Sequence, residues 1–484
     1  MASIVVVGAG LGGLVCATKL ARAGHAVCVV EAQPAAGGRF RVLATEHGPL
    51  APGVGEIGEG DPNLRALLGS LGLDSDDARL VERRHALVLG AKLHRPPPLR
   101  PWEVLVPRLS PRMDRPIDAV FLRRPRWRER RGVVRALWDA SRRGVIGTPE
   151  SVRALDDQTW SRASTRAFGT RWCTTRLGPT LLARTGVDLS AESAAVVVPM
   201  LTRLWAGGGR AVPLPGGPST LIERLAAALP IRTGCRVEGV ESTPDGVRIQ
   251  LREGGREESI GADAVVLAIP PSEILRIAPK LTPIERGYFE SFEPRRSIVL
   301  YRLVSDPAWL LRGLGGVTFV PGEIPDMRDL RILGTPEPTA RAEPFWVRIS
   351  FELAAVDASW TLSDQAIAAK VDAAFRGSPL GDLPSGPSRV DRIGELMSVQ
   401  GRGALARREP FDVRSERTPR LAFATEARTT PDLEGRVTVG LRAAAEAMAC
   451  LDRSDAAGRD PADAAGRDPL RATGAPGRAA ETGT

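Results

Sequence analysis

The sequence predicts an α/β protein, and three stretches of the 484-residue chain carry this prediction. Residues 4–7 form an apolar strand that enters a Gly-x-Gly-x-x-Gly turn, and a helix rich in alanine and leucine follows at 14–23. A second strand is expected at 26–30, and residues 262–271 form a further apolar strand that ends in Pro-Pro. Apolar strands that alternate with helices are typical of a Rossmann-type nucleotide-binding domain.

The first turn needs glycine at three positions, each for a separate physical reason. Gly8 permits a tight exit from the strand, and Gly10 lets the backbone approach a pyrophosphate with no Cβ in the way. Gly13 allows the helix to pack closely on the sheet. Leu11 and Gly12 complete the turn, where the helix N-terminus presents free N–H groups to the phosphates. We therefore predict that these five residues bind a dinucleotide.

Two further features follow the turn. Glu31 ends the second strand 18 residues after Gly13, near the spacing at which a carboxylate meets a ribose hydroxyl pair. Gly37 and Gly38 would let a second loop close over the cofactor. Arg39 would then offset phosphate charge with its forked donors.

The turn, Glu31 and Gly37-Gly38-Arg39 together closely resemble the FAD-binding signature of the flavin amine oxidase superfamily. That group includes amine oxidases, protoporphyrinogen oxidases and phytoene desaturases. The resemblance implies FAD as the cofactor, bound by a glutathione-reductase-like Rossmann domain with an interleaved α+β substrate domain. Rossmann units that bind NAD or SAM lack the second glycine pair, so a nicotinamide-only dehydrogenase is a weaker alternative.

The chain order that the resemblance implies has six parts. They are FAD-binding segments at 1–85, 210–280 and 415–452, substrate-domain segments at 86–209 (largely helical) and 281–414, and a disordered tail at 453–484. The expected elements include a strand at 40–43, helices at 61–71, 221–229 and 363–375, a hairpin at 87–93, and strands at 247–251, 258–260, 297–303 and 345–351. Asp61 and Ser363 are the expected helix caps. The tail repeats Asp-Ala-Ala-Gly-Arg-Asp-Pro and has too little apolar surface to order itself.

Two later positions are compared with the family residue by residue. In relatives the backbone at the position of Val237 pairs with the adenine ring, so the resemblance implies that Val237 contacts the cofactor. The strand at 420–427 lies where relatives end in Gly-Asp, and Thr425-Glu426 replaces that pair. Glu426 keeps a carboxylate on a longer side chain, and it is the implied contact to the ribityl-phosphate region.

The run from Leu433 to Ala444 resembles the family's closing Glu-Gly-Ala-x-x-Ser-Gly-x-x-Ala-Ala motif. Gly435 and Val437 are therefore further expected cofactor contacts. Arg436 replaces a small residue of the family pattern. The resemblance implies that Gly440 begins or closely precedes a helix aimed at the flavin.

The composition argues against several partners. The formal net charge is +9, but only four of the 66 basic residues are lysines, and no basic stripe alternates with stacking aromatics, so nucleic acid is not expected. The five cysteines and four histidines show no metal-ligand spacing. Met1 enters the first strand at once and no 18-residue apolar run follows, so we expect a cytoplasmic protein.

Residues 121–143 carry nine arginines together with two tryptophans. A basic helical face with tryptophans would suit an anionic membrane surface, which gives a peripheral membrane contact as one interpretation. The plainer interpretation is a solvated face with its aromatics turned inward. Pro125 and Gly132 are expected to interrupt a single long helix.

The resemblance implies that a hydride passes from a substrate C–H or N–H bond to FAD while the protein orients the substrate. Amine oxidases place a lysine and aromatic side chains near the flavin, whereas this chain has four lysines and two tyrosines. A large apolar substrate such as a polyene or a porphyrinogen is therefore favoured over an amine. Thr425-Glu426 and Arg436 favour the alternative of a non-catalytic homologue that binds FAD or only its ADP half. No catalytic residue is assigned, and the oligomeric state is left open.

Overall fold

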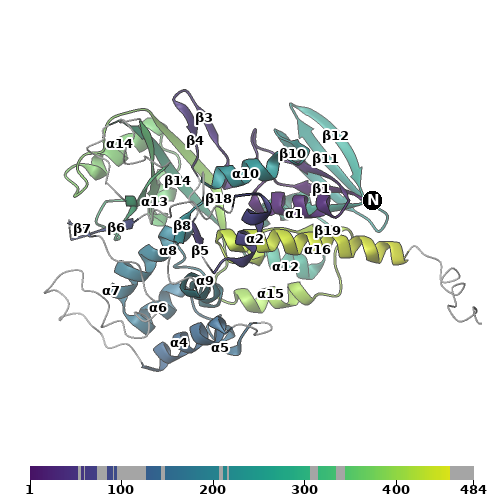
Figure 1. Cartoon of the computed structure of the whole chain (residues 1–484), viewed down its shortest axis with the longest axis horizontal. Coiled ribbons are helices and arrows are strands. Elements are labelled where there is room, and N and C mark those ends of the chain that lie inside the picture. The colour runs from purple at the N-terminus through teal and green to yellow at the C-terminus, as the bar shows by residue number, and fades with distance from the viewer. Residues whose placement is uncertain are drawn as a thin grey trace, which may run out of the picture.

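The computed structural model describes residues 1–52, 56–58, 60–73, 84–90, 92–94, 127–142, 148–206, 211–214, 217–305, 314–333 and 344–457. Its elements fall into three groups: a parallel sheet with its helices, a larger mixed sheet, and a group of helices below both in the view of Figure 1. No helix in these ranges is long and apolar enough to cross a membrane.

A five-stranded parallel sheet, the cofactor sheet, forms the first group. Its strands are β1 (Ser3–Val7), β2 (Ala26–Val30), β9 (Ile231–Arg232), β13 (Ala264–Leu267) and β19 (Leu421–Phe423), in the order β19-β13-β1-β2-β9. Every pairing is parallel. Three distant segments of the chain share this sheet, and the predicted α/β class is confirmed.

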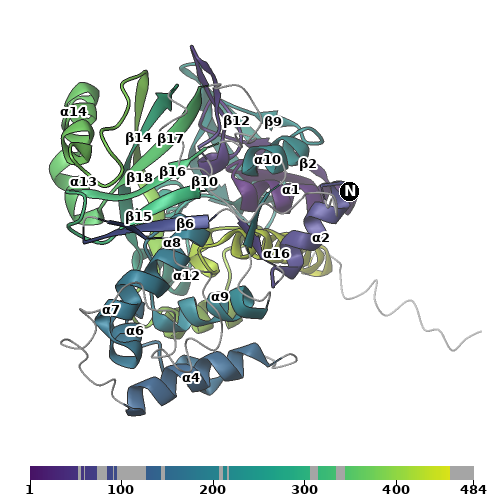
Figure 2. The same cartoon turned by 60° about the vertical axis from the view of Figure 1, so that its left-hand side comes forward.

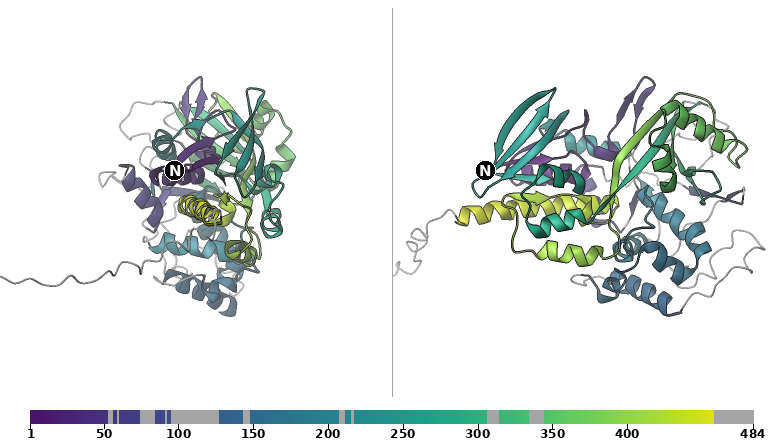
Figure 3. Two further views of the ribbon diagram at one scale, coloured as in Figure 1. Left: turned by 90° about the vertical axis from the view of Figure 1, so that its right-hand side faces the viewer. Right: turned by 180° about the vertical axis from the view of Figure 1, so that it is seen from behind.

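Helices α1 (Leu11–Arg22) and α16 (Leu433–Ala457) pack together on one side of the cofactor sheet (Figures 1 and 3). Gly440 lies within α16, where a Cβ would stand 2.5 Å from the carbonyl oxygen of Gly12. The prediction that a helix begins at or just after Gly440 is therefore wrong, because the helix begins at Leu433. It also continues to Ala457, into the stretch predicted to be a disordered tail, and residues 458–484 lie outside the described ranges.

The other side of the cofactor sheet carries a three-stranded antiparallel sheet and two helices. They are β10 (Cys235–Ser242), β11 (Val247–Glu253), β12 (Arg256–Ala262), α11 (Pro271–Ile277) and α12 (Pro283–Glu290). Val5, Val7 and Val30 share a buried core with Val237 and Val240. The strands predicted at 247–251 and 258–260 both form, so alternating apolar residues located them correctly.

A seven-stranded sheet forms the second group. Its strands are β6 (Arg84–Leu89), β7 (Lys92–His94), β14 (Glu293–Val304), β15 (Leu314–Phe319), β16 (Met327–Ile332), β17 (Phe345–Phe351) and β18 (Ser388–Val399), in the order β18-β14-β17-β16-β15-β6-β7. All neighbours are antiparallel except β15 and β6. The predicted hairpin at 87–93 and strands at 297–303 and 345–351 are confirmed.

The outer face of this sheet is covered by α13 (Leu353–Ser359) and α14 (Asp364–Phe375), as Figures 1 and 2 show. Alternate strand residues such as Leu300 and Ile349 are buried there with Val371. The hydroxyl of Ser363 accepts a 3.1 Å hydrogen bond from the backbone of Ala366, so the predicted cap of α14 is confirmed.

The opposite side, called the inner face below, is turned toward the hairpin of β3 (Leu43–Thr45) and β4 (Gly48–Leu50). Val299, Tyr301 and Trp346 of the sheet pack there with Leu43 and Leu50. Arg41, which precedes the hairpin, lies 3.4 Å from the Asp391 carboxylate on β18. The inner face therefore borders the loop that follows β2.

The strand predicted at 40–43 is wrong. Gly38–Phe40 instead form the 3-10 helix η1, and the hairpin begins at Leu43. Gly37 and Gly38 have φ values of +117° and +54°, and the backbone N–H of Phe40 donates to the carbonyl of Gly37. This turn chemistry overrides the apolar pattern of the residues that follow.

The third group is helical and lies below the seven-stranded sheet in the right-hand panel of Figure 3. Its members are α4 (Trp127–Ser141), α5 (Glu150–Arg153), α6 (Trp160–Phe168), α7 (Thr170–Trp172), the π-helix η4 (Cys173–Leu177), α8 (Gly178–Thr185) and α9 (Ala194–Ala206). Val133 and Leu137 of α4 are buried, whereas Trp138 is 61% exposed. The expected break at Gly132 is wrong because α4 runs through it, and Pro125 lies outside the described residues.

The remaining elements connect these groups. They are β5 (Glu56–Gly58), which pairs with β8 (Ala211–Pro213), α2 (Pro62–Ser70), α10 (Pro218–Ala226), α15 (Ala404–Val413) and the 3-10 helix η6 (Glu426–Arg428). The helices predicted at 61–71 and 221–229 form as α2 and α10. Asp61 precedes α2, but its side chain does not cap the helix, and Asp61 Oδ1 lies 3.8 Å from Arg203 Nε.

Candidate cofactor site

The loop between β1 and α1 requires glycine at two positions. A Cβ on Gly8 would stand 2.6 Å from the carbonyl oxygen of Ala268, and a Cβ on Gly13 would stand 2.1 Å from the carbonyl oxygen of Gly8. Gly10 is the N-cap of α1 with φ −72°, and no described atom lies within 4 Å of its Cβ position. A pyrophosphate would approach the helix N-terminus through this open space.

Glu31 is buried at the end of β2, beside this loop. Its carboxylate accepts a 2.8 Å hydrogen bond from the N–H of Ala9 and a 2.9 Å bond from the N–H of Gln33. The Glu31 carbonyl accepts from the N–H of Cys235, the first residue of β10. Val237 follows two residues later and is 5% exposed. The structure therefore brings the predicted ribose and adenine contacts to one corner of the sheet.

The second glycine pair lies against the first loop. The N–H of Gly37 donates a 2.8 Å hydrogen bond to the carbonyl of Ala9. A Cβ on Gly38 would stand 3.4 Å from the Cα of Gly10. The two loops, separated by α1 and β2 in the sequence, thus form one backbone surface at the carboxyl end of β1, where Rossmann-type sheets bind their ligands.

The beginning and the end of the chain meet at Glu426. Arg39 Nη2 forms an ion pair with Glu426 Oε2, 387 residues away in the sequence. Arg436 Nη2 lies 3.8 Å from the same oxygen, and the N–H of Ser398 donates to Glu426 Oε1 over 3.3 Å. Burial, and then the charge of Arg39, lower the pKa of Arg436. Two guanidinium groups therefore share the Glu426 carboxylate.

The run from Leu433 to Ala444 contacts the first loop through the backbone of both segments. A Cβ on Gly12 would stand 3.4 Å from the carbonyl oxygen of Arg436. Gly435 packs so closely that its Cβ would stand 2.0 Å from the carbonyl oxygen of Thr430. Val437 is fully buried in the same core as Leu11, so a cofactor contact from either residue would come from the backbone.

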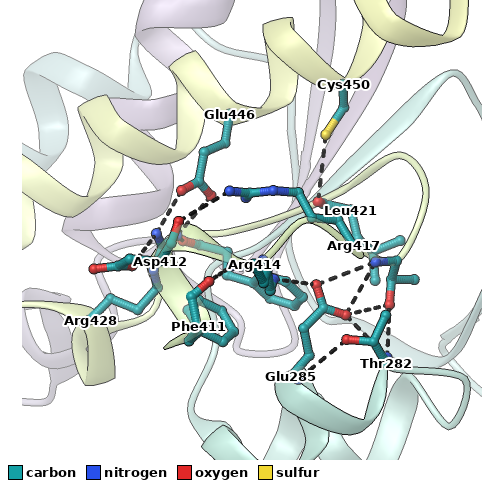
Figure 4. A network of polar contacts seen from close by, with 12 residues as sticks. Thr282, Glu285, Phe411, Asp412, Arg414, Arg417, Leu421, Arg428, Glu446 and Cys450 are labelled. Atoms are coloured by element: carbon teal, nitrogen blue, oxygen red, sulfur yellow. Dashed lines mark hydrogen bonds and ion pairs between the residues drawn. The ribbon is translucent and has the colours of Figure 1, made fainter. Parts of the chain in front are cut away.

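Sequence reasoning missed the ionic network that holds the Glu426 turn. Arg428, 1% exposed, pairs with Glu446 on α16 over 2.6 Å and with Asp412 on α15 over 3.0 Å (Figure 4). It also donates to the carbonyl of Phe423. The two carboxylate partners lie 16 and 18 residues from Arg428 with no motif spacing. No sequence signal identified them, because the pairing depends on how α15 and α16 pack.

A second missed contact lies behind the same turn. Gln400, just after β18, donates from its side chain to the carbonyls of Glu426 and Thr429. Its N–H donates a 2.8 Å hydrogen bond to Glu192 Oε2, while Glu192 Oε1 is buried with no hydrogen-bond partner among the described residues. Burial raises the pKa of Glu192 to about 7. A neutral carboxyl group therefore supports the turn at moderately acidic pH.

The geometry fits a flavin dinucleotide. The space beside Gly10 is open, the Glu31 carboxylate stands at the loop, and Arg436 Nε and Thr425 Oγ1 are buried with no hydrogen-bond partner among the described residues. Buried polar atoms of this kind are rare without a partner, and a phosphate or ribityl group would supply acceptors. Fold and site together define a dinucleotide-binding protein of the Rossmann class.

Comparisons with known proteins assign the family. A family model described as flavin containing amine oxidoreductase matches residues 11–448. The chain is 28% identical over 326 residues to the Mycobacterium tuberculosis protein named "Putative flavin-containing monoamine oxidase AofH", covering 65% of this chain and 67% of that one. A stretch of 50 residues, 10% of each chain, is 54% identical to hydroxyneurosporene desaturase of Cereibacter sphaeroides. Cyclohexylamine oxidase from Brevibacterium oxydans has a similar structure, with a TM-score of 0.66 at 19% identity over 94% of this chain and 99% of that one.

The chain belongs to the flavin-containing amine oxidoreductase family, and it is an FAD-dependent oxidoreductase. The resemblance noted in the sequence is thereby confirmed at the level of the family. The twelve predicted cofactor contacts stay predictions, although the structure gathers them around the two loops and the Glu426 turn.

Proposed function

We propose that this oxidoreductase takes a hydride from an apolar substrate, of the polyene or porphyrinogen kind, and transfers it to FAD. The position of the lysines carries this proposal. Lys19 and Lys92 are exposed, Lys280 is 4.0 Å from Glu241, and Lys370 on the outer helix α14 pairs with Asp326. None of the chain's four lysines is at the cofactor site, so the lysine expected near the flavin of an amine oxidase is missing.

Bound FAD would supply the hydride acceptor, and this chain's residues would position it. Glu31 would hold the ribose hydroxyls, and the N–H groups at the start of α1 would face the phosphates. Arg436 would place a positive charge at the far end of the site. The apolar side chains between the inner face and the β3–β4 hairpin would exclude water. We further propose that the cofactor domain is of the glutathione-reductase type, which the crossover from β9 through the β10–β12 sheet to β13 supports.

An amine is the second candidate substrate. It is favoured by the similarity to AofH and to cyclohexylamine oxidase, whose names specify amines. If the substrate is an amine, a residue other than lysine would have to take the place of the lysine expected beside the flavin.

The spectrum of the purified protein tests the proposal. We expect a yellow protein with flavin absorption bands, which bleach anaerobically when a polyene or a porphyrinogen is added. Aliphatic amines serve as the comparison. Bleaching by amines alone would show that the substrate is an amine and not an apolar polyene or porphyrinogen. A colourless protein that takes up no added FAD would instead support the non-catalytic alternative.

A peripheral membrane contact through α4 is a separate proposal. Trp138 is 61% exposed on this helix, and Arg142 lies 5.8 Å from its ring centre. Flotation with vesicles that contain anionic lipid tests it, and Trp138→Ala is expected to reduce the floating fraction. A wild-type protein that stays at the bottom of the gradient contradicts the contact.

A further inference from the structure

A row of buried polar side chains crosses the inner face of the seven-stranded sheet. Arg348 on β17 is in register with Tyr301 on β14 and with Arg331 on β16. In the next row Ser350 lies opposite Asp329, which is itself opposite Thr318 on β15. Strand residues that alternate with the outer core point to this face, so the row is set by register.

The Asp329 carboxylate is already occupied by two other arginines. Its Oδ2 accepts a 2.9 Å hydrogen bond from Arg331 Nε, and its Oδ1 lies 3.3 Å from Arg328 Nε. Although burial acts in the opposite direction, these arginines hold the pKa of Asp329 well below its usual range. Asp329 therefore stays ionised, and each of its oxygens already contacts another arginine.

Arg348 is 7% exposed, and it forms neither a hydrogen bond nor an ion pair with any residue in the described ranges. Burial lowers the pKa of Arg348. A buried guanidinium with five N–H donors and no acceptor is unfavourable unless a partner supplies one. No described residue supplies that acceptor, which leaves it to water or to a bound ligand.

Three hydroxyl groups on the same face are in a similar condition. Ser350 Oγ and Thr318 Oγ1 are buried and have no hydrogen-bond partner among the described residues. The hydroxyl of Tyr301 likewise bonds to none of them, and Tyr301 is 2% exposed. Three hydroxyl donors and one forked cation thus face the same side of the sheet.

We propose that the inner face binds a carboxylate of the substrate, with Arg348 as the bidentate donor and Tyr301, Ser350 and Thr318 as hydroxyl donors. A planar carboxylate matches the guanidinium fork, and an ammonium would be repelled by the arginines. The site is next to the cofactor loops, because Arg41 bonds to the Gly38 carbonyl and pairs with Asp391 on β18. This inference rests on the proposed function, since it adds an acidic end to the apolar substrate.

Matched ten-carbon probes test the inference on the FAD-loaded enzyme. Decanoate, decyl phosphate, decylamine and decanol are titrated while the flavin spectrum and tryptophan fluorescence are recorded. We expect decanoate to bind most tightly and decylamine and decanol to bind weakly. Arg348→Met is expected to weaken decanoate binding roughly 10- to 100-fold, because a hydrogen-bonded charge pair is lost.

Arg302→Met is the matched control. Arg302 is on the same sheet and equally buried, but it pairs with Asp372 on the outer face over 3.0 Å. We expect this variant to lose stability and to keep its decanoate affinity, while Arg348→Met keeps its stability and loses the affinity. Equal decanoate affinity in Arg348→Met and the wild type would overturn the proposal, as would tighter binding of decylamine. Tighter binding of decyl phosphate than of decanoate would show that the site binds a phosphate and not a carboxylate.

Fluorescence with the protein free of FAD separates this proposal from the proposed function. If the protein binds no FAD but still binds decanoate through Arg348, the oxidoreductase proposal fails and the anion site stands. If flavin bleaching by an uncharged polyene is normal and decanoate does not bind, the anion site fails alone.

Discussion

The two halves of the cofactor site are built by different means. The half proposed to face the pyrophosphate lies within residues 8–39, where Gly8 and Gly13 leave no room for a Cβ. The half proposed to face the flavin depends on Glu426, which pairs with Arg39 across 387 residues of sequence. The first half is steric and local, and the second is electrostatic and assembled by the fold. Substitutions in the first half should act through steric clashes with the fold or with the cofactor, and those in the second should act through charge.

The largest effect is expected from Gly13→Ala. Its Cβ would stand 2.1 Å from a backbone oxygen, so α1 would have to move off the sheet, and we expect a loss of about 4 kcal/mol in the free energy of unfolding. Gly10→Ala is the matched control. Its Cβ meets nothing within 4 Å, so the loss should be at most about 1 kcal/mol, typical for alanine at an N-cap.

Urea unfolding and FAD titration distinguish the two variants. Gly10→Ala should bind FAD at least about tenfold more weakly, because the methyl group occupies the approach of the pyrophosphate. Unchanged FAD affinity in Gly10→Ala would contradict the placement of the pyrophosphate at this loop.

Glu192→Gln should change how stability depends on pH. The pKa of Glu192 in the folded state, about 7, is above the ordinary value of 4.5, so its contribution is most favourable below pH 4.5 and is lost as the pH rises to about 7. The loss amounts to about 3 kcal/mol at most. Glutamine stays neutral and can still accept from Gln400, so the variant should be more stable than the wild type at pH 8 and similar at pH 5.

Thermal melts across this range, with Glu257→Gln as a surface control, measure the effect. A difference between Glu192→Gln and the wild type that does not change with pH would show that Glu192 is ionised throughout.

Arg436→Met tests the half of the site that depends on charge. It removes a buried cation whose ion-pair partner among the described residues, Glu426, is shared with Arg39. We expect the FAD-free protein to gain about 2 kcal/mol, because replacing a buried, poorly paired charge by an apolar group is often stabilising. FAD should bind roughly tenfold more weakly, since a hydrogen-bond donor to the cofactor is lost.

Glu426→Gln should lower the stability of the FAD-free protein. Added FAD should restore most of the lost stability. Melting temperatures with and without FAD measure both variants. If Arg436→Met destabilises the FAD-free protein and leaves FAD affinity unchanged, Arg436 is a structural residue only.

The sequence by itself determined the local half of the site. Gly8, Gly10 and Gly13 are readable because backbone geometry depends on adjacent residues, and the same holds for the cap at Ser363 and the hairpin at 87–93. It misplaced a strand at 40–43, where the turn of Gly37 and Gly38 dominates an apolar run. The resemblance to the family's closing motif set the start of the last helix near Gly440, whereas Gly440 lies inside α16 and allows it to approach α1.

Only the tertiary structure decided the pairing of Glu426 with Arg39 and Arg436, and the row that contains Arg348 and Tyr301. Ion pairs between distant segments have no sequence spacing, and a row across a sheet depends on register, which is set by strands that are far apart in the chain. Local backbone constraints are encoded by neighbouring residues, whereas charge balance and cross-strand contacts are encoded by the whole fold. For this reason the glycine turn was visible in the sequence, whereas the partners of Glu426 and the surroundings of Arg348 were not.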